Sequence, residues 1–180
     1  MKTMLKKNSY GFTLIEMLVV IFIISLLSIL ILANYQNGKK EYTLLQANQK
    51  LISDLRKVQN MAISGTEVEG HCSAVVACYG YGIYFNSSSS YIIFADKNIS
   101  NKVYDIGEGF ETVNLPFPII IQSTIPSPVS IFFESPNPTT YINGINIAGI
   151  SAKIILRVEG AGSSKTVKIN TAGLIENDND

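Results

Sequence analysis

The chain has 180 residues and 47% hydrophobic content, which suits one domain of ordinary size with an extension and argues against disorder as its main state. Lys and Arg total 14, as do Asp and Glu, so the whole chain is neutral. Because three lysines lie in the first ten residues, the part from residue 12 onward has 11 basic and 14 acidic side chains, a net charge of −3, and lacks the positive surplus of a nucleic-acid-binding protein.

Residues 12–33 form an apolar run made almost entirely of Leu, Ile, Val, Phe and Met. As a helix, this run would be about 33 Å long, close to the roughly 30 Å thickness of the hydrocarbon core of a bilayer. Lys2, Lys6 and Lys7 precede the run and no lysine lies within it, so the positive-inside rule places the N-terminus in the cytoplasm. The sequence therefore predicts a single-pass membrane protein, held in the lipid bilayer by residues 12–33, with the rest of the chain outside the cytoplasm.

Glu16 is the one charged residue of this run. A carboxylate in an apolar helix costs about 2.5–3.5 kcal/mol on membrane-insertion scales, so it indicates a cationic partner or a function. Cleavage between Gly11 and Phe12 would create a positive α-amino group four residues from Glu16, and in an assembly the same amine could meet Glu16 of a neighbouring subunit. The alternative is a simple membrane anchor with Glu16 near the lipid headgroups.

The stretch KKNSYGFTLIEMLVVI resembles the class III signal of type IV pilins and type II secretion pseudopilins. It has a short basic leader, Gly11 before the cut, Phe12 after it, and Glu16 as the fifth residue of the mature chain. The resemblance implies a leader peptide over residues 1–11, cleavage by a membrane-embedded prepilin peptidase, and N-methylation of Phe12. It also implies polymerisation with other pilin or pseudopilin subunits on an inner-membrane assembly platform. Many family members have a proline late in this helix, whereas none stands near Ala33 here.

An ordinary secretory signal cut after Ala33 is the competing interpretation. It fits poorly, because its apolar region would exceed the usual 7–15 residues, would contain a glutamate, and would place the large Ile31 where a small residue is needed.

Residues 34–64 keep helical spacing, which predicts one long helix from about residue 12 to 63 with Gly65 as its terminator. Its second half is amphipathic, and Asn48 interrupts the apolar stripe, which favours packing against a sheet over a coiled coil. The apolar stripe consists of Leu44, Leu51, Leu55, Val58 and Ala62. The opposite face carries Lys39, Lys40, Glu41, Lys50, Asp54, Arg56 and Lys57.

Beyond residue 78 the sequence changes to short β-like runs separated by turn residues, such as the serines at 87–90 and the pair at 143–144. All six prolines lie between residues 116 and 138, which predicts a loop-rich region with edge strands. The expected strands are 81–85, 91–95, 118–122, 129–133, 145–149, 152–158 and 165–170. We therefore expect an α+β fold in which residues 65–180 form a mostly antiparallel β-sheet head, with the amphipathic half of the helix on one face.

The head is similar in its order of elements to the GspH/FimT group of minor pseudopilins. The chain has a helix, a string of short strands and a closing strand pair that ends in the Gly-hydrophobic step at 173–175. This likeness implies a minor pilin or pseudopilin of a type IV pilus or type II secretion system, with a role in protein transport. A major pilin and a DNA-binding minor pilin of a competence system are the alternatives.

Cys72 and Cys78 would lie outside the cytoplasm, where the oxidising compartment and the spacing of five intervening residues favour a disulfide. Free thiols and half of a metal site are the alternatives. A zinc site lacks ligands, because His71 is the only histidine and there is no second cysteine pair.

No nucleophile-and-base set or phosphate-binding motif is present, so the sequence predicts neither catalysis nor a cofactor. Residues 96–108 place oxygen-bearing side chains at alternate positions, as in a calcium loop, but they lack the glycine and the final glutamate of an EF-hand. A calcium site of another kind would use Asp96, Asp105 and Glu108; a polar hairpin is the simpler interpretation.

Tyr79, Tyr81, Tyr84 and Tyr91 could stack on bases or sugars, but alternation predicts that 79, 81, 83 and 85 share one strand face and 84 the other. A small basic stripe for DNA would have to come from the last two strands, and the acidic C-terminal tail opposes it. Its residues would be Lys153, Arg157, Lys165 and Lys168.

Overall fold

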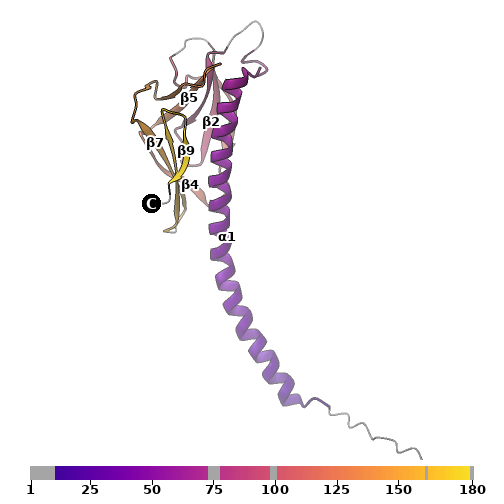
Figure 1. The fold of residues 1–180 in the computed structure, drawn as a ribbon. Helices are drawn as coiled ribbons and strands as arrows, with labels where there is room; N and C mark the ends of the chain where they lie inside the picture. Colours follow the sequence, from indigo (N-terminus) through magenta and orange to yellow (C-terminus); the bar gives the residue numbers. More distant parts are fainter. Residues whose placement is uncertain (1–10, 73–77, 98–100, 161, 179–180) are drawn as a thin grey trace, which may run out of the picture. The chain divides into compact units, whose positions relative to one another are not determined.

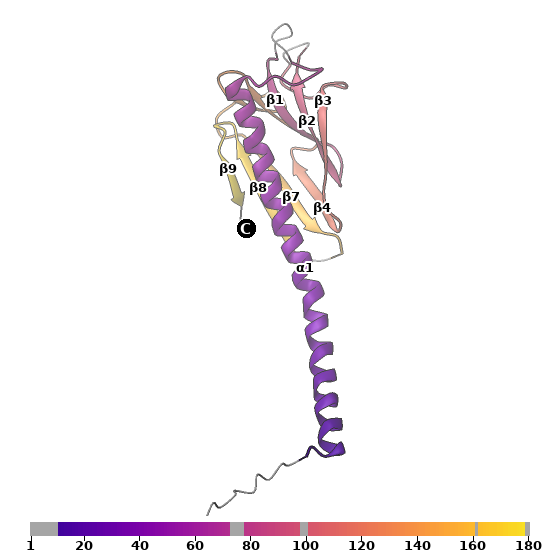
Figure 2. The same ribbon diagram turned by 90° about the vertical axis from the view of Figure 1, so that its right-hand side faces the viewer.

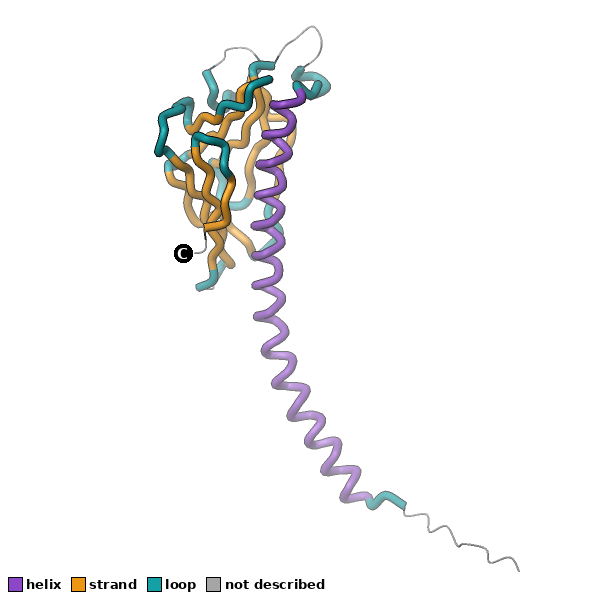
Figure 3. Tube along the Cα trace, viewed as in Figure 1, coloured by secondary structure: helices purple, strands orange, loops and turns teal. Residues whose placement is uncertain are grey.

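The computed structural model describes residues 11–72, 78–97, 101–160 and 162–178. The chain divides into two units, residues 1–39 and 40–180. One helix, α1 (Leu14–Ser64), contributes to both units, and nine strands follow it within the described ranges (Figures 1 and 3). The strands are β1 (Gly80–Phe85), β2 (Ser90–Asp96), β3 (Gly109–Asn114), β4 (Ile119–Ile125), β5 (Val129–Glu134), β6 (Thr140–Ile142), β7 (Ser151–Val158), β8 (Ser164–Asn170) and β9 (Ile175–Asp178).

Helix α1 begins and ends close to the expected residues 12 and 63, and local capping explains both ends. Thr13 caps the start, because its Oγ1 accepts the backbone N–H of Glu16 at 3.3 Å. Gly65 terminates the helix with a left-handed φ of +58°, which lets Thr66 donate its N–H to the carbonyl of Met61 at 3.2 Å. The predicted glycine terminator is therefore confirmed.

In the described part of the chain, no helix combines the length and the apolar character that crossing a bilayer requires.

The head contains two antiparallel sheets where one was expected. The first has the strand order β3-β2-β1-β5-β6 and the second the order β4-β7-β8-β9. Four of the six prolines lie in the connections into and out of β4, where the chain passes from the first sheet to the second and back, and the other two lie in the connection from β5 to β6 within the first sheet. The expected α+β class with antiparallel pairing is confirmed, and β4 is an edge strand as the prolines indicate.

The second half of α1 lies along the sheets, as Figure 2 shows. All five residues of the predicted apolar stripe are at most 1% exposed and join one core with side chains of β1, β2, β4, β5, β6, β7 and β8. Burial of a single Leu or Val side chain contributes about 1.5–3 kcal/mol, so this stripe holds the helix to the head.

Two residues of α1 depart from the expected pattern. Asp54 was expected on the charged face but is buried, because Tyr91 and Lys50 bind its carboxylate (below). Asn48 does not interrupt the buried face either, since it is itself buried and donates its side-chain N–H to Asn177 Oδ1 at 3.0 Å.

Three short strands, β3, β6 and β9, were not predicted. Residues 145–149 were expected to form a strand but do not. Only an isolated bridge between Ile142 and Ile145 occurs there. The side chain of Asn146 donates to the carbonyls of Thr140 and Thr171, and Gly149 has a φ of +90°. These contacts hold the segment as a loop despite its β-like composition.

Candidate processing and assembly site

The predicted cleavage site lies immediately before α1. Gly11 and Phe12 have no regular secondary structure, and both are exposed. A backbone in this state is accessible to a peptidase, whereas a helical backbone would have to unwind first. The basic leader residues Lys2, Lys6 and Lys7 lie outside the described residues.

Thr13 is a helix-capping residue of this segment that the sequence interpretation missed. It occupies the N-cap position, and Glu16 is three residues later, which is the T-x-x-E spacing of a capping box. The spacing alone could have revealed it. A carboxylate in the first helical turn also interacts favourably with the positive end of the helix dipole, so Glu16 favours a helix that starts just after the cut.

Glu16 is exposed, and the described residues offer its carboxylate no side-chain partner. The amine of Phe12 exists only after cleavage, so the uncut chain cannot form the expected ion pair. The pairing of Glu16 with the amine of Phe12 therefore stays a prediction.

The first half of α1 exposes a continuous series of large apolar side chains. Phe12 is 72% exposed and Leu14 84%, and most of the following side chains that are described up to Ile31 are also exposed. An apolar surface of this extent is typical of a membrane or protein contact, because a soluble monomer rarely leaves one uncovered. Ser25 and Ser28 do not break it, since their hydroxyls donate to carbonyls one turn earlier.

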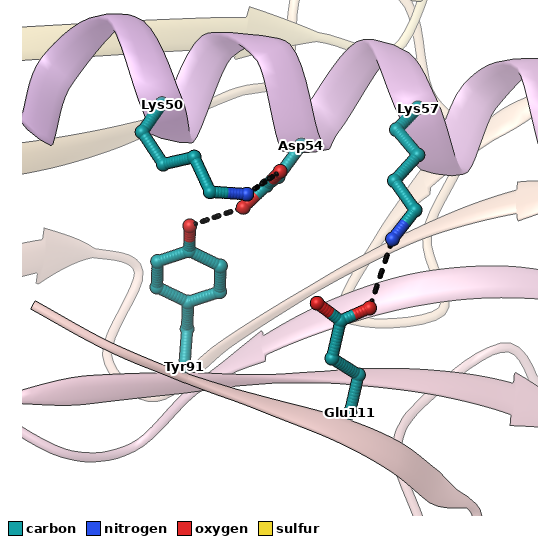
Figure 4. Close-up of polar contacts among 5 residues, drawn as sticks. All are labelled: Lys50, Asp54, Lys57, Tyr91 and Glu111. Carbon is teal, nitrogen blue, oxygen red and sulfur yellow. Dashed lines mark hydrogen bonds and ion pairs between the residues drawn. The ribbon is translucent and has the colours of Figure 1, made fainter.

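Polar contacts also join α1 to the first sheet (Figure 4). Tyr91 in β2 donates its hydroxyl to Asp54 Oδ2 at 2.6 Å, and Lys50 binds Asp54 Oδ1 at 2.5 Å. Burial, followed by the hydrogen bond to Asp54, raises the pKa of Tyr91 well above its ordinary value. Nearby, Lys57 pairs with Glu111 of the edge strand β3 at 2.8 Å.

Cys72 and Cys78 form a disulfide, with Cα atoms 5.4 Å apart. Cys72 is buried, and the backbone around it pairs with Val68 in an isolated bridge. The His71 ring lies edge-on to Phe110 at 5.9 Å between centroids. The Cys72–Cys78 disulfide thus ties the loop that follows α1 to the start of β1.

The calcium candidate does not form a metal site in the described residues, where no three His, Cys, Asp or Glu side chains are grouped so as to hold an ion. Asp96 ends β2 and accepts the N–H of Lys102 at 3.2 Å, while Glu108 accepts the N–H of Asp105 at 2.9 Å. Burial, with a smaller contribution from Glu108, raises the pKa of Asp96 to about 6. The two carboxylates thus accept backbone hydrogen bonds that hold the loop 101–108. Asn98 and Ser100, two further positions of the alternating pattern, lie outside the described residues.

The residues of the expected basic stripe do not all share a face. Lys153 and Arg157 lie on the same face of β7, and Lys168 of β8 pairs in register with Lys153, so these three share one face of the second sheet. Lys165 is three positions from Lys168 and so faces the other side. Lys153 is also neutralised by Asp178 at 2.8 Å, and this contact lowers the pKa of Asp178. The basic stripe expected to bind DNA is therefore split between the two faces of the second sheet, and part of its positive charge is neutralised by Asp178.

The tyrosines follow the predicted strand alternation. Tyr81 and Tyr91 are buried in the core, whereas Tyr84 lies on the other face of the first sheet and stacks on Tyr104 at 4.7 Å between centroids. Tyr79 is about half exposed. Strand packing thus accounts for three of the four side chains.

Comparison with known proteins identifies the N-terminal segment. No curated protein and no solved structure is significantly similar to the chain. Residues 6–32 match the model of the prokaryotic N-terminal methylation motif, and the match includes the predicted cut, the Thr13 cap and Glu16. The chain therefore carries, over residues 6–32, the N-terminal methylation motif, which is the type of processing signal found in type IV pilin-like prepilins.

Proposed function

We propose that the protein is a minor pilin or pseudopilin, a structural subunit of a type IV pilus or a type II secretion pseudopilus. Its activity is assembly and not catalysis. The observation that carries the proposal is the match over residues 6–32, together with the unstructured, exposed Gly11–Phe12 bond directly before a capped helix with an uncovered apolar surface.

In this proposal, residues 12–33 hold the precursor in the inner membrane, with the head outside the cytoplasm. The peptidase removes residues 1–11, and the new amine of Phe12 is methylated. Transfer into a filament then covers the exposed apolar side chains of α1 with those of other subunits, and Glu16 neutralises the terminal amine of its own or a neighbouring chain. The inner-membrane assembly platform is the expected partner for this step.

A minor subunit is proposed over a major pilin because the disulfide closes a small loop early in the head, between Cys72 and Cys78. The division of the basic residues between the two faces of the second sheet gives no support to a DNA-binding role.

Mass spectrometry of the mature N-terminus tests the proposal. The expected mass is that of a chain starting at N-methylated Phe12, and a Gly11→Val variant should keep all eleven leader residues. A wild-type chain that keeps its leader in the producing cell, or one trimmed after Ala33, would overturn the proposal.

A further inference from the structure

A cleft of about 420 Å³ lies at the end of the second sheet where β7 begins and β8 ends. Two turns, 147–150 and 170–173, form its walls together with the strand residues Ser151 and Lys168. Its volume is within the range of about 300–1,000 Å³ that small-molecule sites occupy in proteins. All the residues that line the cleft belong to the head and lie outside the matched motif at 6–32.

Hydrogen bonds fix the two turns against each other, so the cleft is formed before any ligand arrives. The first turn is closed by a hydrogen bond from the Ile150 N–H to the Ile147 carbonyl at 3.2 Å. The second is closed by a hydrogen bond from the Gly173 N–H to the Asn170 carbonyl at 2.9 Å. Thr171 connects them, since its N–H donates to the Ile150 carbonyl at 3.2 Å and its hydroxyl to the Ile147 carbonyl at 2.9 Å. A preformed site of this kind loses little conformational entropy when a ligand binds.

Three side-chain donors line the cleft from one face of the second sheet. Ser151 of β7 is directly opposite Asn170 of β8, and Lys168 is two positions before Asn170, so all three share this face. Asn170 Oδ1 accepts the N–H groups of Ala172 at 3.0 Å and Leu174 at 3.1 Å, which leaves its Nδ2 as a hydrogen-bond donor. Within the described ranges, the side chains of Ser151 and Lys168 make no hydrogen bond or ion pair. A hydroxyl, an amide and an ammonium group are therefore available to one ligand.

The charge and size of the cleft favour a ligand that combines one anionic group with neutral hydroxyls. Lys168 is the one charged residue among those that line it. Glu176 of β9 is the register partner of Lys168 but is exposed and outside the lining, and Asp178 binds Lys153 at 2.8 Å. A lone inorganic ion would leave most of the volume and the two neutral donors unused. Neighbouring positions on this face are about 5–7 Å apart, which matches a sugar ring with its substituents.

We propose that the cleft binds a sugar carboxylate, such as a uronic acid unit of an acidic polysaccharide. The carboxylate pairs with the ammonium group of Lys168, and ring hydroxyls bond to Asn170 Nδ2 and to the Ser151 hydroxyl. The Thr171 hydroxyl donates its own hydrogen to Ile147, so its lone pairs accept a hydrogen bond from the sugar. The inference concerns the head alone and does not depend on filament assembly.

Binding is tested by an NMR titration of the full-length chain in micelles of a neutral detergent, with trigalacturonate as the probe. The side-chain amide of Asn170 and the backbone amides of Ala148 and Gly149, which line the cleft, should shift with a dissociation constant in the millimolar range or below. The fully methyl-esterified trimer has no charge and should bind at least about tenfold more weakly, because hydrogen bonds to charged groups are the stronger ones. No shift at Asn170 with trigalacturonate, or equal binding of the acid and the ester, would overturn the proposal.

Two variants and a second probe locate the contact. Lys168→Gln should bind trigalacturonate at least about tenfold more weakly. Lys165→Gln, on the other face of the same strand, should bind it as the wild-type chain does. Undiminished binding by Lys168→Gln would overturn the proposal, and the comparison of acid with ester in the wild-type chain decides the matter even if this variant fails to fold. Sodium phosphate at the same concentration should leave Asn170 unshifted; phosphate that binds as tightly as the trimer would show a general oxyanion site and overturn the assignment to sugars.

Discussion

Tyr91 of β2 donates a hydrogen bond from its hydroxyl to Asp54 of α1 at 2.6 Å, inside the interface between helix and strand. The sheet thus supplies a hydrogen-bond donor to a buried carboxylate of the helix. The other oxygen of Asp54 receives Lys50, whose side chain is 56% exposed. The carboxylate is therefore held from both sides, by a buried neutral donor and by a partly hydrated cation.

The Tyr91→Phe substitution should destabilise the head by about 1–3 kcal/mol, because it leaves one oxygen of Asp54 buried without its donor. Lys50→Ala is the matched control and should cost less than about 1 kcal/mol, since water can replace the exposed ammonium. Thermal unfolding of the two purified variants gives the comparison. Equal losses for both would show that the buried hydroxyl has no special role.

Leu51→Ala should destabilise the head by about 2–5 kcal/mol, because Leu51 is fully buried between helix and sheets and its removal leaves a cavity. Leu45 is on the same helix but is 40% exposed, so Leu45→Ala should cost much less. The measurement is the midpoint of unfolding in denaturant, compared between variants whose unfolding free energy has the same dependence on denaturant concentration. If Leu45→Ala proved as damaging as Leu51→Ala, the assigned buried stripe would be wrong.

Asp96→Asn should stabilise the protein near neutral pH. The pKa of Asp96 is raised to about 6, against an ordinary value near 4, so the folded state binds a proton more tightly than the unfolded state. That stabilisation is complete below about pH 4 and is lost as pH rises through about 6. Asn keeps an acceptor for the N–H of Lys102 without the buried charge.

The difference in melting temperature between Asp96→Asn and wild type should therefore be largest at pH 7.5 and small at pH 4. Asp178→Asn, which removes a partly buried carboxylate paired with Lys153, should show no gain at pH 7.5. A variant of Asp96 that is less stable than wild type at pH 7.5 would contradict the prediction.

Glu16→Ala should permit cleavage after Gly11 but abolish incorporation into filaments, because in the proposed function the carboxylate of Glu16 neutralises a terminal amine. Immunoblots of sheared filaments report incorporation, and the mass of the cellular protein reports cleavage. Glu41→Ala, a change in the same helix outside the matched motif, is the control. Normal amounts of Glu16→Ala protein in filaments would favour the simple-anchor interpretation.

Several features follow from the sequence because they depend on neighbouring residues. The segment YGFTLIE contains the predicted cut, the Thr13 cap and the acidic Glu16 of the matched motif in seven letters. The 3.6-residue spacing of the apolar side chains after residue 43 identifies which face of α1 packs against the sheets. Gly65 as terminator and the proline-flanked edge strand β4 likewise need only local stereochemistry.

Features that depend on residues far apart in the chain were decided only by the tertiary structure. Asp54 has the composition of a surface residue, and its burial follows from a tyrosine 37 positions later. Residues 145–149 have the letters of a strand, but hydrogen bonds from Asn146 to distant carbonyls make them a loop. The division into two sheets, and the packing of Tyr104 from the loop 101–108 against Tyr84 and Phe94 of the first sheet, arise because long-range packing outweighs the weak intrinsic preferences of short segments.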